Sequence, residues 1–117
     1  MSVGMPAALK LDEFASHVWA VFGEPPYLVG SALTQKHGWR DVDVRMILPD
    51  EQWDAMGLGD PLRTHRNSKW VALCLAFSLL GKEMTGLPID FQLQRRTDAN
   101  AEFDGPRSAL GMVGLRF

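Results

Sequence analysis

The amino-acid sequence predicts a mixed α+β fold, in which a short mixed β-sheet of at least three strands is flanked by helices. Two segments, 41–48 and 87–94, alternate apolar and polar residues with a period of two, which is typical of strands with one buried face. Two other segments, 9–22 and 68–85, space their apolar residues as amphipathic helices do. With 117 residues and 46% hydrophobic content, the chain fits one domain over 1–117, with a core at 9–94 and a C-terminal extension at 95–117.

The first part of the chain is expected to pass from a helix to a strand and back to a short helix. The helix predicted over 9–22 ends before Gly23, and the apolar segment 27–29 is expected to be a short strand. Ser31 is a suitable N-cap for a short helix over 32–37, which Gly38 would close. The strand over 41–48 then ends at Pro49, with its apolar residues on one face: Val42, Val44, Met46 and Leu48.

The second part contains a brief helix at 49–56, a loop at 57–67 and the main core helix, which ends at Gly86. The apolar stripe of that long helix is predicted to consist of Trp70, Leu73, Phe77, Leu80 and Met84. The strand at 87–94 would point Ile89, Phe91 and Leu93 inward and Asp90, Gln92 and Gln94 to the opposite face. The tail at 95–117 has no clear period, and short helical turns are expected at 101–104 and 107–112.

Composition and charge exclude several classes of protein. The net charge of −2 argues against a surface that coats nucleic acid or an anionic membrane. Cys74 is the only cysteine, so the sequence contains neither a disulfide framework nor a thiolate metal site. The longest apolar stretch, 71–80, is too short for a membrane span. We therefore expect a cytoplasmic protein without a membrane partner.

Three carboxylates and one glycine-containing turn are the candidate chemistry of this chain. Asp41 and Asp43 share the polar face of one predicted strand, about 6.5–7 Å apart at Cα, and Asp90 lies on the polar face of another. Gly30 and Ser31 follow a short apolar strand and open a predicted helix, where unpaired amides can hold phosphate oxygens. Like charges on one sheet face repel each other, so this arrangement predicts a requirement for metal ions.

The order and spacing of these motifs resemble the nucleotidyltransferase superfamily that includes polymerase beta and the aminoglycoside nucleotidyltransferases. The residues that carry the resemblance are Val29-Gly30-Ser31, Asp41-Val42-Asp43 and Ile89-Asp90-Phe91. It extends over about 9–94 and implies a minimal, single-domain member of that fold. It also implies a magnesium-dependent enzyme that moves a nucleoside monophosphate from an NTP such as ATP to a hydroxyl and releases pyrophosphate.

In this interpretation Asp41 and Asp43 bridge two Mg²⁺ ions, and Asp90 helps to hold the second ion and to orient or deprotonate the acceptor hydroxyl. The Gly30 and Ser31 amides and the Ser31 hydroxyl hold the β- and γ-phosphates. Arg66 and Lys69, at the start of the long helix, are further candidates for contact with the triphosphate. Positive charge at this end opposes the helix dipole, and a bound anion would offset that unfavourable interaction.

Other interpretations stay open at this level. The acceptor can be a small molecule, RNA or protein, and a homodimer or a partner protein can supply the surface that binds it. The alternative to an enzyme is a non-catalytic nucleotide-binding or protein-interaction module on the same fold, and a nuclease or phosphatase is a more distant option. Taken singly, Gly-Ser turns and Asp-x-Asp strands are commonly just surface features.

Overall fold

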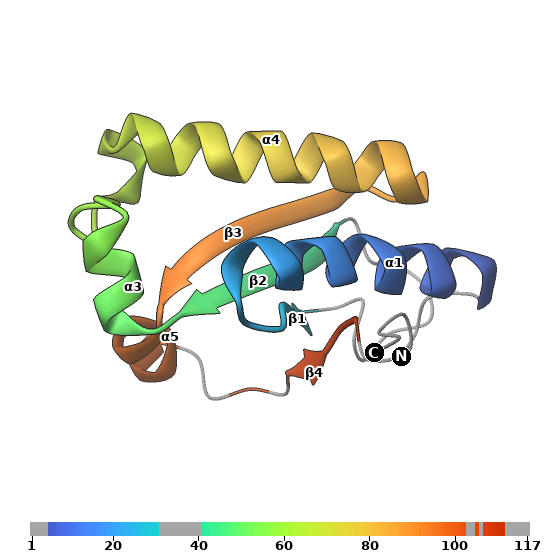
Figure 1. Ribbon diagram of the computed structural model, residues 1–117, viewed down its shortest axis with the longest axis horizontal. Helices are drawn as coiled ribbons and strands as arrows, with labels where there is room; N and C mark the ends of the chain where they lie inside the picture. Colours follow the sequence, from blue (N-terminus) through green and yellow to red (C-terminus); the bar gives the residue numbers. More distant parts are fainter. Residues whose placement is uncertain (1–4, 31–40, 103–104, 106, 112–117) are drawn as a thin grey trace.

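The computed structural model describes residues 5–30, 41–102, 105 and 107–111. Its elements, in chain order, are α1 (Met5–Phe22), β1 (Tyr27–Val29), β2 (Val42–Leu48), α3 (Asp50–Ala55), the 3-10 turn η1 (Thr64–Arg66), α4 (Ser68–Thr85), β3 (Ile89–Arg95), α5 (Arg96–Glu102) and β4 (Ser108–Ala109) (Figure 1). The helix expected at 32–37, with its N-cap Ser31, lies outside the described residues. Among the described residues, the strands and long helices expected from hydrophobic periodicity are therefore confirmed.

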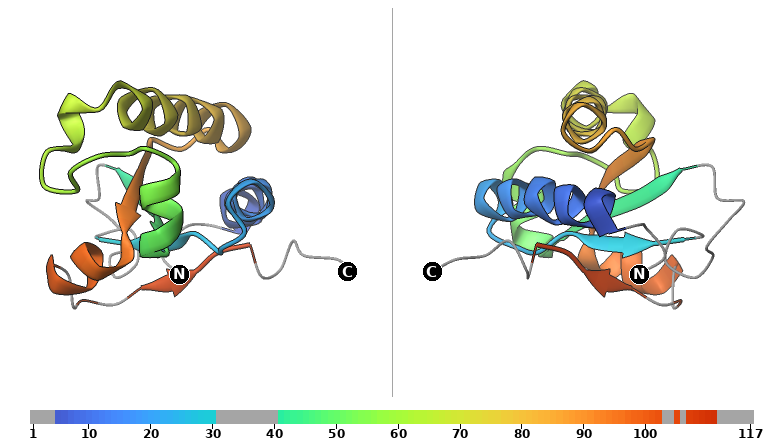
Figure 2. Two further views of the ribbon diagram at one scale, coloured as in Figure 1. Left: turned by 60° about the vertical axis from the view of Figure 1, so that its left-hand side comes forward. Right: turned by 90° about the vertical axis from the view of Figure 1, so that its right-hand side faces the viewer.

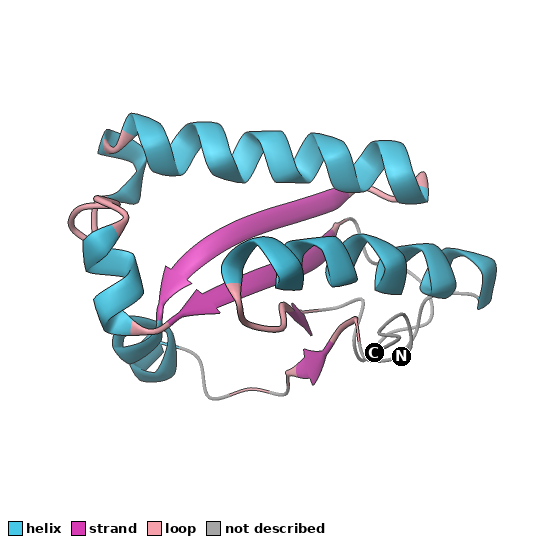
Figure 3. Cartoon of the chain, viewed as in Figure 1, coloured by secondary structure: helices cyan, strands magenta, loops and turns pink. Residues whose placement is uncertain are grey.

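The strands form one mixed sheet in the order β3-β2-β1-β4 (Figure 3). β2 and β3 are parallel neighbours, whereas β1 pairs antiparallel with both β2 and β4. In this register Asp43 lies directly opposite Asp90 on one side and Val29 on the other. The expected mixed α+β fold with at least three strands is confirmed, and the sheet brings the carboxylate-bearing strands next to each other.

The hydrophobic core lies between the sheet and the helices α1 and α4. The apolar residues of β2 at alternate positions, Val42, Val44, Met46 and Leu48, are each 0% exposed, as the alternation predicts. An aromatic cluster joins the layers: Phe91 of β3 lies 5.1 Å from Phe77 of α4 and 6.5 Å from Phe14 of α1, measured between ring centroids. No helix in the described residues has both the length and the apolar character needed to cross a membrane.

Helix α4 runs along the outer edge of the sheet, where its side chains bind the free backbone groups of β3. Ser78 Oγ accepts a hydrogen bond of 2.9 Å from the Phe91 N–H, and Trp70 Nε1 donates one of 2.9 Å to the Leu93 carbonyl. The Cys74 sulfur accepts from the Leu93 N–H, and burial raises the pKa of this thiol to about 11. These contacts protect an edge strand that could otherwise pair with another chain.

Helix α4 begins at Ser68 and ends before Gly86, as expected, but its apolar stripe differs from the prediction at one position. The Asn67 side chain caps the first turn by accepting from the Trp70 N–H at 2.9 Å, and Gly86 ends the helix at φ 73°. Leu80, predicted to face the core, is 42% exposed, and the neighbouring Gly81 is buried instead. A Cβ at Gly81 would lie 3.0 Å from side-chain atoms of both Phe14 and Ile89, so a larger residue here would require these side chains to shift.

The C-terminal part contains more regular structure than its sequence pattern predicts. Helix α5 begins immediately after β3, earlier than the turn expected at 101–104, and Thr97 anchors it to Asp50 at the start of α3. Residues 108–109, expected to form a helical turn, are instead strand β4, which pairs with β1. The expectation was wrong because this strand depends on a partner that is distant in sequence. The Leu110 N–H also donates to the Pro26 carbonyl at 2.9 Å, which extends that pairing.

Candidate functional site

One face of the sheet, opposite α1, carries the polar side chains of β2 and β3. Because side chains alternate along a strand, Asp43 and Arg45 of β2 lie on the same face as Asp90, Gln92 and Gln94 of β3, and all are partly buried. Helix α5 lies on this side of the sheet, away from α1 (Figure 2). The polar side chains are therefore held by rigid strands next to the core, with a helix along part of their border.

Asp43 and Asp90 form the centre of this face. They are register partners on adjacent parallel strands, which places their Cα atoms about 4.8 Å apart. Asp41 precedes the first residue of β2, is exposed, and acts on Asp43 through its charge. The described residues contain no group of three or more His, Cys, Asp or Glu side chains arranged to hold a metal ion. The structure thus brings together Asp43 and Asp90, with Asp41 at the margin of the pair.

Gly30 lies against the Asp43 carboxylate at the end of β1. Its φ of 75° is in the left-handed region, which glycine adopts without steric cost. A Cβ at this position would lie 2.3 Å from Asp43 Oδ2, a distance at which atoms overlap. Both the backbone conformation and the close approach of Asp43 therefore require glycine here. Ser31, the other candidate of the turn, lies outside the described residues.

Arg45 is a residue of this site that the motif-based reasoning did not select. Its Nη2 atom lies 3.6 Å from Asp43 Oδ1 and 3.4 Å from Asp90 Oδ2, and its Nη1 donates to the Asp90 backbone carbonyl at 2.7 Å. The Arg45 side chain is only 14% exposed. The signal was present in the alternation of β2, which puts position 45 on the same face as position 43. The guanidinium partly neutralises the two facing carboxylates.

The pKa of Asp43 is raised despite this nearby cation. Burial of the carboxyl is the largest cause, the positive charge of Arg45 opposes it, and the negative charges of Asp90 and Asp41 raise the pKa further. A side-chain hydrogen bond with Asp90 acts in the same direction. Burial and the neighbouring carboxylates therefore make the ionised form of Asp43 costly in the folded protein despite Arg45, and a bound cation would offset part of that cost.

This raised pKa predicts a pH dependence of stability that Asp43→Asn should remove. Above the unfolded value of about 3.8 the unfolded chain releases the Asp43 proton first, so the fold loses stability as pH rises through the higher folded pKa. Asparagine has no such titration. We expect the free energy of unfolding of the wild type to fall relative to Asp43→Asn between pH 3.5 and pH 7, measured by urea denaturation without divalent cations. Parallel pH profiles of the two proteins would contradict this.

A cavity of about 300 Å³ opens beside the carboxylates. The residues that line it are Val29, Gly30, Asp43, Arg45, Gln92, Gln94, Glu102 and Arg107. Within the described part of the chain, no hydrogen bond engages the side-chain amides of Gln92 and Gln94, so both can bind a ligand. The space is large enough for part of a nucleotide and has polar groups on several sides.

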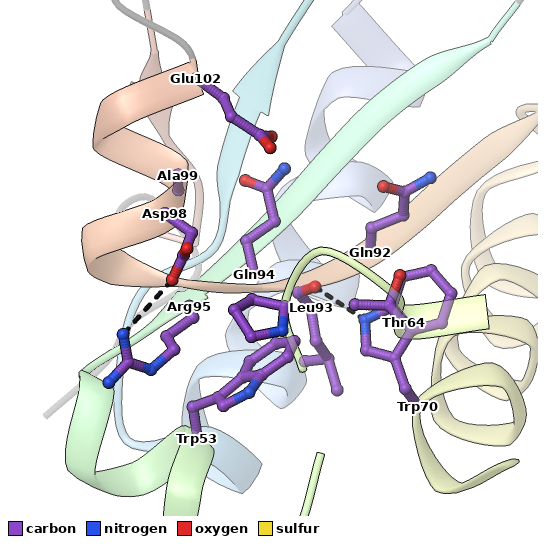
Figure 4. A pocket seen from close by; sticks show the side chains of 11 residues that line it. Trp53, Thr64, Trp70, Gln92, Leu93, Gln94, Arg95, Asp98, Ala99 and Glu102 are labelled. Carbon is purple, nitrogen blue, oxygen red and sulfur yellow. Dashed lines mark hydrogen bonds and ion pairs between the residues drawn. The ribbon is translucent and has the colours of Figure 1, made fainter. Parts of the chain in front are cut away.

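A second, smaller cavity of about 120 Å³ adjoins the first, and Gln92, Gln94 and Glu102 line both (Figure 4). Two indoles form part of its wall, but each already donates its N–H to a backbone carbonyl: Trp53 to Gly59 and Trp70 to Leu93. Their ring nitrogens are therefore structural. The glutamine side chains of β3 therefore contribute to the walls of both cavities.

Arg66 and Lys69 are not brought to Gly30 and Asp43. Arg66 ends the η1 turn and Lys69 lies in the first turn of α4, which the Trp70 bond to Leu93 places near the C-terminal end of β3. Asp43 and Asp90 lie at the opposite, N-terminal ends of their strands. Neither basic residue lines the cavity that holds Gly30 and Asp43.

Comparisons of this chain with protein-family models, with curated protein sequences and with solved structures found no significant match. Function is therefore inferred from the geometry of the site itself. Its central features are the facing carboxylates of Asp43 and Asp90, the guanidinium of Arg45 and the close approach of Gly30.

Proposed function

We propose that this chain is a metal-dependent nucleotidyltransferase of nucleotidyltransferase-like fold, which transfers a nucleoside monophosphate from an NTP to an acceptor hydroxyl. The observation that carries the proposal is the direct opposition of Asp43 and Asp90 on parallel strands, next to a glycine whose replacement would strain the backbone and displace Asp43. Phosphoryl and nucleotidyl transfer require mainly charge neutralisation and alignment, which rigid carboxylates and a close backbone can supply.

The chemistry of the donor set fits Mg²⁺. This ion is usually held by one or two protein carboxylates together with substrate phosphates, so Asp43 and Asp90 are sufficient as its protein ligands. The raised pKa of Asp43 supports this: burial is its largest cause and the negative charges of Asp90 and Asp41 add to it, and a bound cation would offset the resulting cost of the ionised form. Bound Mg²⁺ would neutralise charge on the phosphates and polarise them. Asp41, at the margin, is the candidate to complete a site for two ions.

The residues of the chain have separate roles in this proposal. The absence of a side chain at Gly30 leaves room for the Asp43 carboxylate, and the backbone of the turn beside it is the candidate contact for phosphate oxygens. Asp90, whose side chain is 39% exposed, accepts the proton of the acceptor hydroxyl. The hydroxyl oxygen forms a bond to the α-phosphorus, the bond from that phosphorus to the bridging oxygen of the β-phosphate breaks, and pyrophosphate leaves.

The position of the Arg45 guanidinium between the two carboxylates favours a second candidate function, a nucleotide-binding or protein-interaction module without turnover. Its guanidinium lies within 3.6 Å of both carboxylates, so an internal cation already occupies part of the space that a metal would use. In the first candidate this arginine moves aside or contacts a phosphate when the nucleotide binds. In the second it remains in place and keeps the carboxylates neutralised.

The decisive experiment is incubation of the purified chain with each of the four common ribonucleoside triphosphates, with and without MgCl₂, followed by measurement of pyrophosphate. Pools of small hydroxyl compounds, RNA and protein serve as acceptors, and mass spectrometry detects an added nucleotide. Mg²⁺-dependent pyrophosphate release supports the enzyme. Thermal stabilisation by nucleotide without pyrophosphate supports the module, and no effect of Mg²⁺ or nucleotide contradicts both.

Arg45→Met separates the two candidates at the level of the site. Removal of the guanidinium leaves the facing carboxylates without a cation and should lower the free energy of unfolding by about 1–3 kcal/mol. If the carboxylates bind Mg²⁺, millimolar MgCl₂ should restore most of this loss in thermal denaturation. Arg63→Met is the matched control, since Arg63 forms an exposed ion pair with Asp60. Loss of stability in Arg45→Met that MgCl₂ does not restore would contradict the metal site.

A further inference from the structure

The outer side of α4 exposes a continuous strip of apolar residues. Leu75 and Leu79 are each 58% exposed, and Val71 and Leu80 are each 42% exposed. Ala72 and Ala76, also exposed, fill the space between these side chains. Residues four apart in a helix lie on the same side, so these side chains form one surface rather than scattered contacts. We call this surface, formed by Val71, Ala72, Leu75, Ala76, Leu79 and Leu80, the α4 outer face.

This face is not needed by the fold of the chain itself. The inner side of α4 already binds the edge of β3 and packs against the core through Leu73 and Phe77. Helix α4 lies at the rim of the molecule in both views of Figure 2, with no other described element outside it. Contiguous exposed apolar surface of this kind is typical of an interface with another chain.

The charges at the two ends of α4 indicate that the partner at this interface is a second copy of the same chain. Lys69 lies in the first turn and Glu83 in the last, and each opposes the helix dipole at its end, although Lys82 in the last turn complements it. Within the described residues neither Lys69 nor Glu83 forms an ion pair, and neither has an oppositely charged residue three or four positions away in the helix. Both charges would be compensated by an antiparallel helix that carries the same sequence.

We propose that two copies of this chain associate through their α4 outer faces, with the two helices antiparallel around a two-fold axis. Lys69 of one copy then faces Glu83 of the partner subunit, and the reciprocal pair forms by symmetry. Within one helix, Lys69 and Glu83 are about 21 Å apart along the axis, so the two ion pairs lie at opposite ends of the interface. The two-fold axis passes beside Ala76, the residue halfway between Lys69 and Glu83. A small residue at the crossing point allows helix axes to approach to about 8 Å.

The same register pairs small residues with large ones. Ala72 of one copy lies opposite Leu80 of the other, so the apolar side chains interdigitate rather than collide. None of the outer-face residues lines the cavity beside Asp43, so the dimer leaves that site accessible. The proposal therefore does not depend on the function proposed above, and each can fail without the other.

A charge-reversal series tests the orientation. Sedimentation equilibrium of the wild-type chain over a wide concentration range is expected to show a reversible dimer. Lys69→Glu should weaken dimerisation at least about tenfold, because it places two repelling carboxylate pairs at the interface. Lys69→Glu combined with Glu83→Lys should restore it. Lys10→Glu, an exposed lysine of α1, is the control and should have no effect. A monomeric wild type at every concentration, or a double variant as weak as the single one, would overturn the proposal.

Disulfide trapping at the two-fold axis provides a second measurement. Ala76→Cys should give a covalent dimer under mild oxidation, because the two residues at position 76 face each other at the crossing point. Ala20→Cys, at another exposed alanine, in α1, should stay monomeric. Leu79→Glu in the Ala76→Cys background should abolish the covalent dimer by placing a charge in the apolar strip. Equal trapping of the two cysteine variants would show that collisions rather than a specific interface produce the dimer, and would contradict the proposal.

Discussion

Replacement of Asp43 by asparagine is expected to lower Mg²⁺-dependent pyrophosphate release by about three orders of magnitude while the fold remains intact. Asparagine has nearly the same shape as aspartate but cannot supply the negative charge that holds a divalent cation. Since ionised Asp43 is destabilised by burial and by neighbouring carboxylates, the loss of its charge should not destabilise the fold at neutral pH. Activity would be measured as initial rates of pyrophosphate release, and folding by urea denaturation.

Two further variants make this result specific. Asp90→Asn should cause a comparable loss, because Asp90 faces Asp43 across the parallel strands. Asp54→Asn should retain full activity, since Asp54 is exposed and contacts Arg95 at the other end of the sheet. An Asp43→Asn protein with more than a tenth of wild-type activity would show that this carboxylate does not hold the metal. Equal losses in Asp43→Asn and Asp54→Asn would point to a general effect of reduced charge.

Replacement of Gly30 by alanine is expected to impair the site without touching any charge. The left-handed backbone at φ 75° costs a non-glycine residue about 1–2 kcal/mol. The added Cβ would also lie 2.3 Å from Asp43 Oδ2 and must displace that carboxylate. A displacement of about 1 Å in a catalytic group can reduce activity about a hundredfold, and we expect a loss of that order. Rates of pyrophosphate release and urea denaturation measure the two effects separately.

Gly23 provides a matched control for this variant. It also has a positive φ, 80°, but a Cβ there would meet nothing within 4 Å. Gly23→Ala should therefore show the stability loss of the backbone conformation alone, with normal activity. The difference between the two alanine variants isolates the contact with Asp43. If Gly30→Ala and Gly23→Ala have the same activity, the close approach of Gly30 to Asp43 has no catalytic role.

Local pattern was sufficient to predict most of the regular structure. The strand 27–29 was predicted correctly from its short apolar run. The apolar alternation of β2 was also predicted correctly, because the period of two is set by the strand backbone itself. The end of α4 at Gly86 was predicted correctly, because a glycine closes a helix through its own local backbone conformation. The inward position assigned to Leu80 was wrong, because a stripe inferred from spacing cannot reveal that close packing against Phe14 and Ile89 selects Gly81 instead.

The candidate site was predictable only in part. The alternation placed Asp43 and Asp90 on the polar faces of their strands, but only the parallel register placed them opposite each other. The ion pairs of Arg45 depend on the rotamer that its side chain adopts between the two strands, which no sequence pattern specifies. Arg66 and Lys69 were selected because positive charge opposes the dipole at the start of α4. This local argument does not determine position in the fold, and neither residue lines the cavity that contains Gly30.

The sequence by itself determined the α+β class, the main strands and helices, and the faces on which the carboxylates lie, because these depend on interactions within a few residues. Only the tertiary structure decided that β4 pairs with β1, that Arg45 neutralises Asp43 and Asp90, and that α4 keeps an apolar side exposed. These features arise from contacts between residues far apart in the chain. Their free energy depends on distances and burial that exist only after the chain has folded.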